Sequence, residues 1–175
     1  MAAYENDQDT TDAVNNILPH TIWLIVEGGS VDDIVKAIAK NKTGGTGLKG
    51  SVTGTFNEVL TKPDGTNYTI VHDMQFNRPT SITLYLKVTL TRKVSTVPID
   101  TDLVKQLLSA LTFSINQNAI ASNLYSTVYQ AGSTFVATDL EVSLDGITYT
   151  PTSLTTAADE KFTLAIANIA VTEVV

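Results

Sequence analysis

The clearest pattern of apolar and polar positions lies between residues 20 and 50. Residues 22–26 are five consecutive apolar residues, too few for a membrane span and typical of a strand buried on both faces. Gly28 and Gly29 then predict a tight turn. After this turn, apolar residues recur at intervals of three and four, which predicts an amphipathic helix. Its apolar stripe consists of Val31, Ile34, Val35, Ile38 and Ala39.

The polar residues of this segment support the same helix. Ser30 is placed to accept a hydrogen bond from the amide of Asp33, as an N-cap residue does. Acidic residues in the first turn and lysines toward the end suit the helix dipole. The helix is expected to stop at Gly44 and Gly45. Each polar residue of the segment therefore has a structural role, and none is left for chemistry.

Alternation of apolar and polar residues predicts strands in the next part of the chain. Residues 51–60 and 66–76 alternate on either side of a Pro-Asp-Gly-Thr turn at residues 63–66, which predicts a hairpin. Residues 81–94 show the most regular alternation in the chain. We expect them to form one long strand.

The C-terminal part is expected to hold two helices and then two strands. Asp100 or Thr101 caps the first helix, and a short second helix follows Ser122 and stops at Gly132. A change of apolar phase in the last strand predicts a bulge near Asn168. The apolar stripe of the first helix is Val104, Leu107, Leu108, Leu111 and Ile115. The buried face of the first strand is Val136, Leu140, Val142 and Leu144, before an Asp145-Gly146 turn.

These elements predict an α+β fold made of two small subdomains. Each subdomain is expected to have a mixed or antiparallel sheet with one or two packed helices. Residues 19–98 form the first (strand, helix, hairpin, strand) and residues 99–175 the second (two helices, two strands). The strand at 81–94 is expected to pass between them. Residues 1–18 are polar and acidic, and we interpret them as a leader or the remnant of a preceding domain.

Composition narrows the classes of function. The 175 residues carry 18 acidic and 11 basic side chains, a net charge of −7, and no cysteine. The absence of cysteine excludes disulfides and thiolate metal sites. Nucleic-acid binding needs clustered basic residues, so we expect no nucleic-acid partner. No apolar run is long enough to span a membrane.

The glycine-rich stretch from Gly44 to Ser51 invites comparison with a phosphate-binding loop. Such a loop needs adjacent Gly, Lys and Ser or Thr residues at the start of a helix. Here Lys49 follows Leu48, and the stretch leaves a helix and enters a strand. We therefore interpret it as a flexible connector. At the turn before the helix, Glu27 and the acidic first turn would repel an anion.

The two histidines, His20 and His72, lie far apart in the sequence. They lack metal-binding spacing, and zinc needs three or four ligands. His72 and Asp73 offer at most half a site. Glu27 and Asp33 lie on different elements, so a carboxylate pair is not expected. We predict no catalytic, cofactor-binding or metal-binding residues, and that the protein is not an enzyme.

Several residues are candidates for contact with other proteins. Pro79 forces Arg78 out of the helical region, and Arg78 either pairs with a nearby carboxylate or anchors an interface. Trp23 lies in an all-apolar run and is expected in the core. Tyr85 lies on the polar face of its strand and suits a contact surface.

The order of several short motifs resembles the baseplate J-like proteins of contractile phage tails and related particles. The motifs are Tyr4-Glu5-Asn6, Val26-Glu27-Gly28-Gly29, a helix with a basic residue and a Gly-x-Gly loop, Phe76 followed by Arg78-Pro79-Thr80, and Asp159-Glu160-Lys161-Phe162. The resemblance covers most of the chain and implies the C-terminal portion of a longer protein.

The resemblance implies a structural role in the wedge of the tail baseplate. The partners would be copies of the chain and other baseplate proteins, and the site of action would be the virion tail, after synthesis in the host bacterial cytoplasm. The alternative is a stand-alone β-rich binding module, for example one that recognises carbohydrate. Such sites usually display exposed aromatic residues, and Tyr129 and Tyr149 are the candidates expected near loops.

Overall fold

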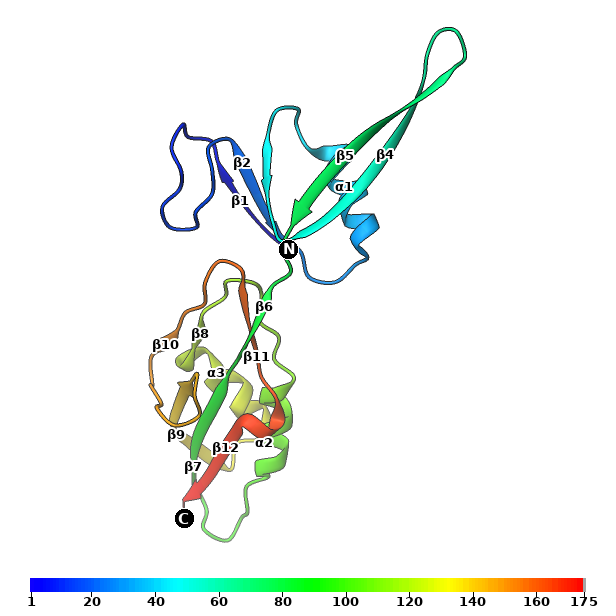
Figure 1. The fold of residues 1–175 in the computed structure, drawn as a ribbon. Helices are drawn as coiled ribbons and strands as arrows, with labels where there is room; N and C mark the ends of the chain where they lie inside the picture. Colours follow the sequence, from blue (N-terminus) through cyan, green and yellow to red (C-terminus); the bar gives the residue numbers. More distant parts are fainter. Residues whose placement is uncertain (175) are drawn as a thin grey trace. The chain divides into compact units, whose positions relative to one another are not determined.

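The computed structural model describes residues 1–174 and has the predicted α+β fold. The chain divides into two compact units, one from Met1 to Pro79 and one that begins at Thr80 (Figure 1). The sequence pattern predicted this boundary between residues 98 and 99. The difference arises because residues 80–92 form strands that pair only with later parts of the chain.

The first unit contains a three-stranded sheet, one helix and a long hairpin. Strands β1 and β2 pair antiparallel, and β2 pairs parallel with β3. Within residues 1–18, which we interpreted as a leader or remnant, strand β1 pairs with β2 along its whole length. The elements are β1 (Ala2–Asn6), β2 (Thr21–Ile25), α1 (Val31–Asn41), β3 (Gly47–Lys49), β4 (Val52–Thr61) and β5 (Asn67–Phe76).

Helix α1 connects the parallel strands β2 and β3 and begins at the predicted cap. The amide of Asp33 donates to Ser30 Oγ at 3.2 Å, and Ser30 Oγ donates to Asp33 Oδ2 at 2.6 Å. The buried side of α1 includes Val35 and Ile38, which pack with Met74 and Phe76 of β5. This small cluster is the core of the first unit.

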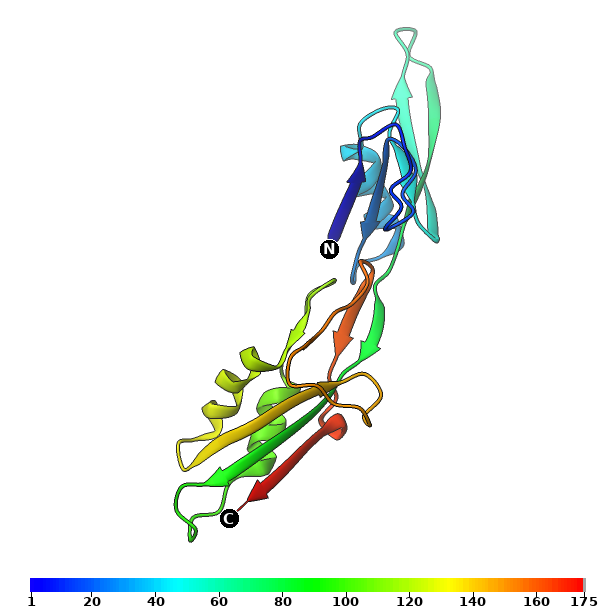
Figure 2. The same ribbon diagram turned by 90° about the vertical axis from the view of Figure 1, so that its left-hand side faces the viewer.

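The second unit is a two-layer arrangement of helices on one face of a mixed sheet (Figure 2). In the main sheet β7 lies in the centre, parallel to β12 and antiparallel to β9. The elements are β6 (Thr80–Thr83), β7 (Tyr85–Arg92), α2 (Thr101–Ser109), β8 (Ala119–Ile120), α3 (Ala121–Val128), the 3₁₀ turn η1 (Tyr129–Ala131), β9 (Phe135–Ser143), β10 (Ser153–Leu154), β11 (Glu160–Thr163), the 3₁₀ turn η2 (Ile166–Asn168) and β12 (Ile169–Val174).

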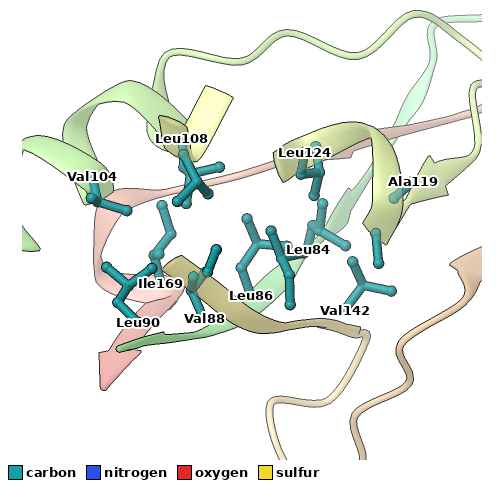
Figure 3. Close-up of a cluster of buried hydrophobic side chains, with 14 of the residues drawn as sticks. Leu84, Leu86, Val88, Leu90, Val104, Leu108, Ala119, Leu124, Val142 and Ile169 are labelled. Atoms are coloured by element: carbon teal, nitrogen blue, oxygen red, sulfur yellow. The ribbon is translucent and has the colours of Figure 1, made fainter. Parts of the chain in front are cut away.

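The core of the second unit lies between the main sheet and helices α2 and α3 (Figure 3). Alternate residues of β7 point into it and are fully buried, as the alternation in the sequence predicts. Asp100 caps α2 by accepting a hydrogen bond from the Leu103 amide at 2.9 Å. The core residues labelled in Figure 3 are Leu84, Leu86, Val88, Leu90, Val104, Leu108, Ala119, Leu124, Val142 and Ile169.

The single long strand predicted at 81–94 is wrong in one respect. It is interrupted at Leu84, and its two halves join different neighbours: β6 pairs with β11, and β7 pairs with β12 and β9. It lies wholly within the second unit and does not pass between two subdomains. The partner strands are interrupted as well, because the turn η2 separates β11, which pairs with β6, from β12, which pairs with β7. That turn replaces the bulge predicted near Asn168.

Two further predictions in the second unit are corrected. Helix α2 ends at Ser109, so Leu111 and Ile115 lie beyond it. In β9, the pairing with β7 skips one residue, because Asp139 lies opposite Thr89 and Ala137 opposite Leu90. This bulge reverses the inward phase of β9. Val136, predicted to be buried, is therefore exposed, and Leu144 is exposed because it lies beyond the end of β9.

Candidate protein-contact surface

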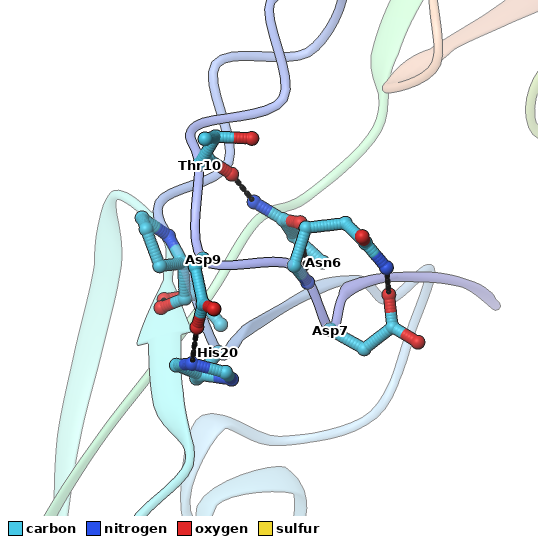
Figure 4. A network of polar contacts seen from close by, with 8 residues as sticks. Asn6, Asp7, Asp9, Thr10 and His20 are labelled. Atoms are coloured by element: carbon cyan, nitrogen blue, oxygen red, sulfur yellow. Dashed lines mark hydrogen bonds and ion pairs between the residues drawn. The ribbon is translucent and has the colours of Figure 1, made fainter.

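The two histidines take part in separate pairs, each with one carboxylate. His20 Nε2 lies 3.0 Å from Asp9 Oδ1 in the loop between β1 and β2 (Figure 4). The buried Asn6 organises the same loop, because its side-chain amide donates to the carbonyls of Thr10 and Ile17, each at 2.8 Å. This gives the asparagine of the Tyr4-Glu5-Asn6 motif a structural role that sequence reasoning did not assign.

His72 lies in β5, where its Nε2 is 3.0 Å from Glu58 Oε2 and its ring stacks on Phe56. Its neighbour Asp73 lies on the other face and accepts a hydrogen bond from Thr55 at 3.0 Å. Successive strand residues point to opposite faces, so His72 and Asp73 do not form half a metal site together. Among residues 1–174, no group of three or more potential metal ligands comes together.

The glycine-rich stretch after α1 becomes strand β3 and does not present a free cation. Lys49 donates a hydrogen bond to the Asn15 carbonyl, and its Nζ lies 4.0 Å from the centre of the Trp23 ring. Trp23 is buried, as predicted, on the sheet face opposite α1 and beside Tyr4. The lysine that suggested a phosphate loop therefore covers a tryptophan instead.

Arg78 supports the turn that precedes α1. Its guanidinium donates to the carbonyls of Val26 at 3.0 Å, Gly29 at 2.8 Å and also Gly28, and it lies over the Phe76 ring. Its partners in this turn are backbone carbonyls and not a carboxylate, which was one of the two partners considered from the sequence. Gly28 and Gly29 both have positive φ, so their carbonyls converge in a way that a fork-shaped donor can bridge. The Arg-Pro-Thr motif and the Gly-Gly motif are thus two halves of one structural element.

The tyrosines singled out from the sequence lie in separate places in the second unit. Tyr85 is half-buried, and its ring lies against Gly146. Tyr129 follows α3, stacks on Phe135 and accepts a hydrogen bond from the Ala137 amide. Tyr149 lies beside Lys87, whose side chain is on the sheet face away from the helices. Tyr129 and Tyr149 therefore do not form a shared stacking platform.

The most prominent free surface belongs to the outer half of the β4–β5 hairpin, residues 57–71, which we call the distal hairpin. An 11-residue helix is about 16 Å long, whereas ten-residue strands span about 33 Å. Helix α1 therefore covers only the half of the hairpin near Gly54, and the distal hairpin extends past it (Figure 1).

Apolar side chains remain exposed on both faces of the distal hairpin. Val59 and Val71 lie on one face and are each 61% exposed. Tyr68 and Ile70 lie on the other face and are 41% and 37% exposed. Exposed apolar side chains gathered in this way are typical of surfaces that contact other proteins. The sequence contained this signal, since apolar residues occur in both phases of the strand beyond the length that one short helix can cover.

The turn at the end of the distal hairpin is closed by several hydrogen bonds. Lys62 donates its amide to the Thr66 carbonyl at 2.8 Å, and Gly65 has the positive φ that the turn requires. The hydroxyl and amide of Thr66 both bond Asp64 and hold the pKa of its carboxyl below the usual value. The exposed strands are thus presented in a defined conformation.

Comparisons with known proteins add no relative. The chain matches no protein-family model, and a search of curated proteins found no match either. None of the helices in residues 1–174 has the length and apolar character needed to cross a membrane.

Proposed function

We propose that this chain is a structural component of a contractile-tail baseplate and acts through protein–protein contacts. The observation that carries the proposal is the distal hairpin, a fully paired two-stranded segment with exposed apolar residues on both faces. Such a surface suits burial against neighbouring subunits. The baseplate assignment comes from the motif resemblance, and the linked roles of Arg78 and the Gly28-Gly29 turn explain why those motifs occur together.

In this proposal the second unit is the scaffold and the first unit carries the contact surface. The partners are copies of the chain and neighbouring baseplate proteins, and assembly takes place in the bacterial cytoplasm before the tail is complete. No side chain is assigned to catalysis or to a cofactor. The mechanism is mechanical, because contacts between packed subunits can switch between discrete arrangements when the tail contracts.

The test is to locate the chain in particles. Antibodies against the chain should label the baseplate end of contractile tails released by the producing cells, as seen by electron microscopy. Labelling along the sheath, or none on intact particles, would contradict the proposal. Saturable binding to a glycan array would instead favour the carbohydrate-recognition alternative.

A variant pair connects this test to the distal hairpin. Val71→Ser removes an exposed apolar side chain there, and Val136→Ser removes one from the second unit, where Val136 is 40% exposed. We expect Val71→Ser to reduce incorporation into particles several-fold and Val136→Ser to leave it unchanged. Equal incorporation of both variants would show that the distal hairpin is not the contact surface.

A further inference from the structure

The outer edge of strand β5 has no strand partner along the distal hairpin. In the described part of the chain, β4 and β5 pair only with each other, as a two-stranded sheet. An exposed strand edge presents unpaired amides and carbonyls, which other strands can bind. The outward-facing backbone groups of β5 determine which strand can bind this edge.

The turn bond determines which residues face outward. Lys62 and Thr66 are a hydrogen-bonded pair, and such pairs alternate along an antiparallel ladder. Even-numbered residues of β5 therefore bond to β4, and odd-numbered residues direct their amides and carbonyls outward. Asn77 confirms this parity, because its amide donates to the Leu24 carbonyl and its carbonyl accepts from Val26, both on β2. The same edge thus bonds to β2 at Asn77, just after β5, and has no strand partner along the distal hairpin.

The free edge between Asn67 and Asp73 lacks the features that normally prevent strand pairing. Natural edge strands are protected by Lys, Pro, bulges or short length. The stretch Asn-Tyr-Thr-Ile-Val-His-Asp contains no Lys, Pro or Gly, and it pairs with β4 without a bulge. Its only acidic residue is Asp73, at one end. This composition favours a strand partner over permanent exposure to water.

We propose that this edge pairs antiparallel with the same edge of a second copy of the chain, about a two-fold axis at Ile70. The two hairpins then form one four-stranded sheet. The proposal rests on the protein-contact function above and deepens it by naming the partner and the register. A two-fold contact is self-complementary, so each residue pair occurs twice except the pair on the axis itself.

The chemistry of the facing residues supports this register. Around Ile70 the even-numbered residues face one another as non-hydrogen-bonded pairs, in which side chains come closest. No pair brings like charges together, and one pair offers a hydrogen bond between an amide and a carboxylate. The facing pairs are Ile70 with Ile70, Thr69 with Val71, Tyr68 with His72, and Asn67 with Asp73.

The other edge of the hairpin fits a second copy less well. Glu58 of β4 lies directly opposite Ile70. The equivalent two-fold register on β4 would therefore place one Glu58 against another. Like charges directly opposite destabilise a strand pair. In the equivalent register, the β5 edge is therefore favoured over the β4 edge.

A matched pair of proline variants tests which edge is used. Val59 and Val71 are equally exposed valines on opposite edges, and both direct their amides outward. Proline removes the outward donor but leaves the β4–β5 bonds in place. By light scattering over a dilution series, we expect the wild type and Val59→Pro to show twice the 18.7 kDa chain mass. We expect Val71→Pro to show only 18.7 kDa.

Cysteine variants test the register, because the chain has no cysteine of its own. Ile70→Cys places two thiols at the two-fold axis, so oxidation should give a covalent dimer rapidly. Val71→Cys is the control: Val71 is more exposed than Ile70, so random collision would favour its cross-linking, whereas the register opposes it. Faster cross-linking of Val71→Cys would overturn the register.

The edge-pairing proposal is overturned if the wild type remains monomeric, or if Val71→Pro still dimerises while retaining its fold by circular dichroism. These outcomes are distinct from failure of the baseplate proposal. A monomeric chain that still labels tail baseplates would refute only the edge pairing. A dimer through β5 without tail labelling would refute only the baseplate assignment.

Discussion

The two units of this protein bury their apolar residues to very different extents. The second unit has a core cluster of eighteen buried residues between a mixed sheet and two helices. The first has a cluster of four such residues under a single helix, with Ile17, Trp23 and Ile25 buried outside this cluster, and a hairpin that the helix covers only in part. Stability rises with the apolar surface that a unit buries. The second unit is therefore built to hold its shape, and the first to present surface.

The two units also differ in where their exposed apolar side chains lie. In the second unit they are scattered around loops and edges, as on most protein surfaces. In the first unit four of them lie close together on adjacent strands with free edges. Changes that weaken one unit or uncouple α1 from the hairpin should show whether this division of roles is correct.

The largest effect is expected from removing the central aromatic side chain of the first unit. Phe76 is fully buried, and Phe76→Ala should cost about 3–5 kcal/mol. With so small a core, we expect the first unit to unfold while the second stays folded. Hydrogen exchange with mass spectrometry, which resolves the two units, measures this.

Phe162→Ala is the matched change in the second unit, where Phe162 is equally buried and packs edge-on against Phe113. We expect a similar loss of free energy, but the larger core should keep the unit folded. The comparison of the two cores is wrong if both variants unfold the same unit. It is also wrong if both units stay folded in both variants.

A smaller effect is expected from Gly54→Ala, which tests the packing of α1 on the hairpin. A Cβ at this position would lie 2.6 Å from Cγ2 of Val35. Overpacking of this kind typically costs about 1–3 kcal/mol. Gly44→Ala is the control, because its Cβ would meet no atom within 4 Å. Urea denaturation should show a lower midpoint for Gly54→Ala only.

The helix caps allow the two units to be compared with equivalent changes. Ser30→Ala in the first unit and Asp100→Ala in the second each remove one N-cap bond, worth about 1 kcal/mol. We expect exchange protection to fall more in α1 than in α2, because α1 has less tertiary packing to support it. Equal loss in the two helices would contradict this expectation.

The smallest effect concerns acid. In the second unit, the amides of Ile147 and Thr148 and the Ser143 hydroxyl lower the pKa of Asp145. Hydrogen bonding to Arg92 lowers the pKa of Glu173. A carboxyl with a lowered pKa in the folded state stabilises the fold above its unfolded value and loses this contribution as pH falls.

The stability of the second unit should therefore decline below about pH 4.5, the ordinary pKa of the Glu side chain. Glu173→Gln cannot titrate, so its thermal midpoint should depend less steeply on pH in this range. Because both carboxyls are accessible to solvent, the effect should be modest. An identical acid profile for the variant and the wild type would exclude a contribution from Glu173.

Much of the local structure could be predicted from the sequence. The cap at Ser30, the start of the helix after it, the hairpin and its turn, and the cap at Asp100 all appear where the pattern placed them, whereas that helix ends at Asn41, before the predicted stop at Gly44 and Gly45. The distal hairpin was not identified as a surface, although the strand and helix lengths imply it. The edge of β5 could not be identified, because pairing partners are not encoded in local periodicity.

The sequence by itself determined the elements whose causes are local, since caps, turns and amphipathic periods involve residues within a few positions of one another. Only the tertiary structure decided the pairing of β1 with β2, the break at Leu84 and the boundary after Pro79. Glu160 pairs beside Thr80 across eighty positions of chain. Such long-range contacts depend on which strands can bury their apolar faces together, and this is decided by the whole chain at once.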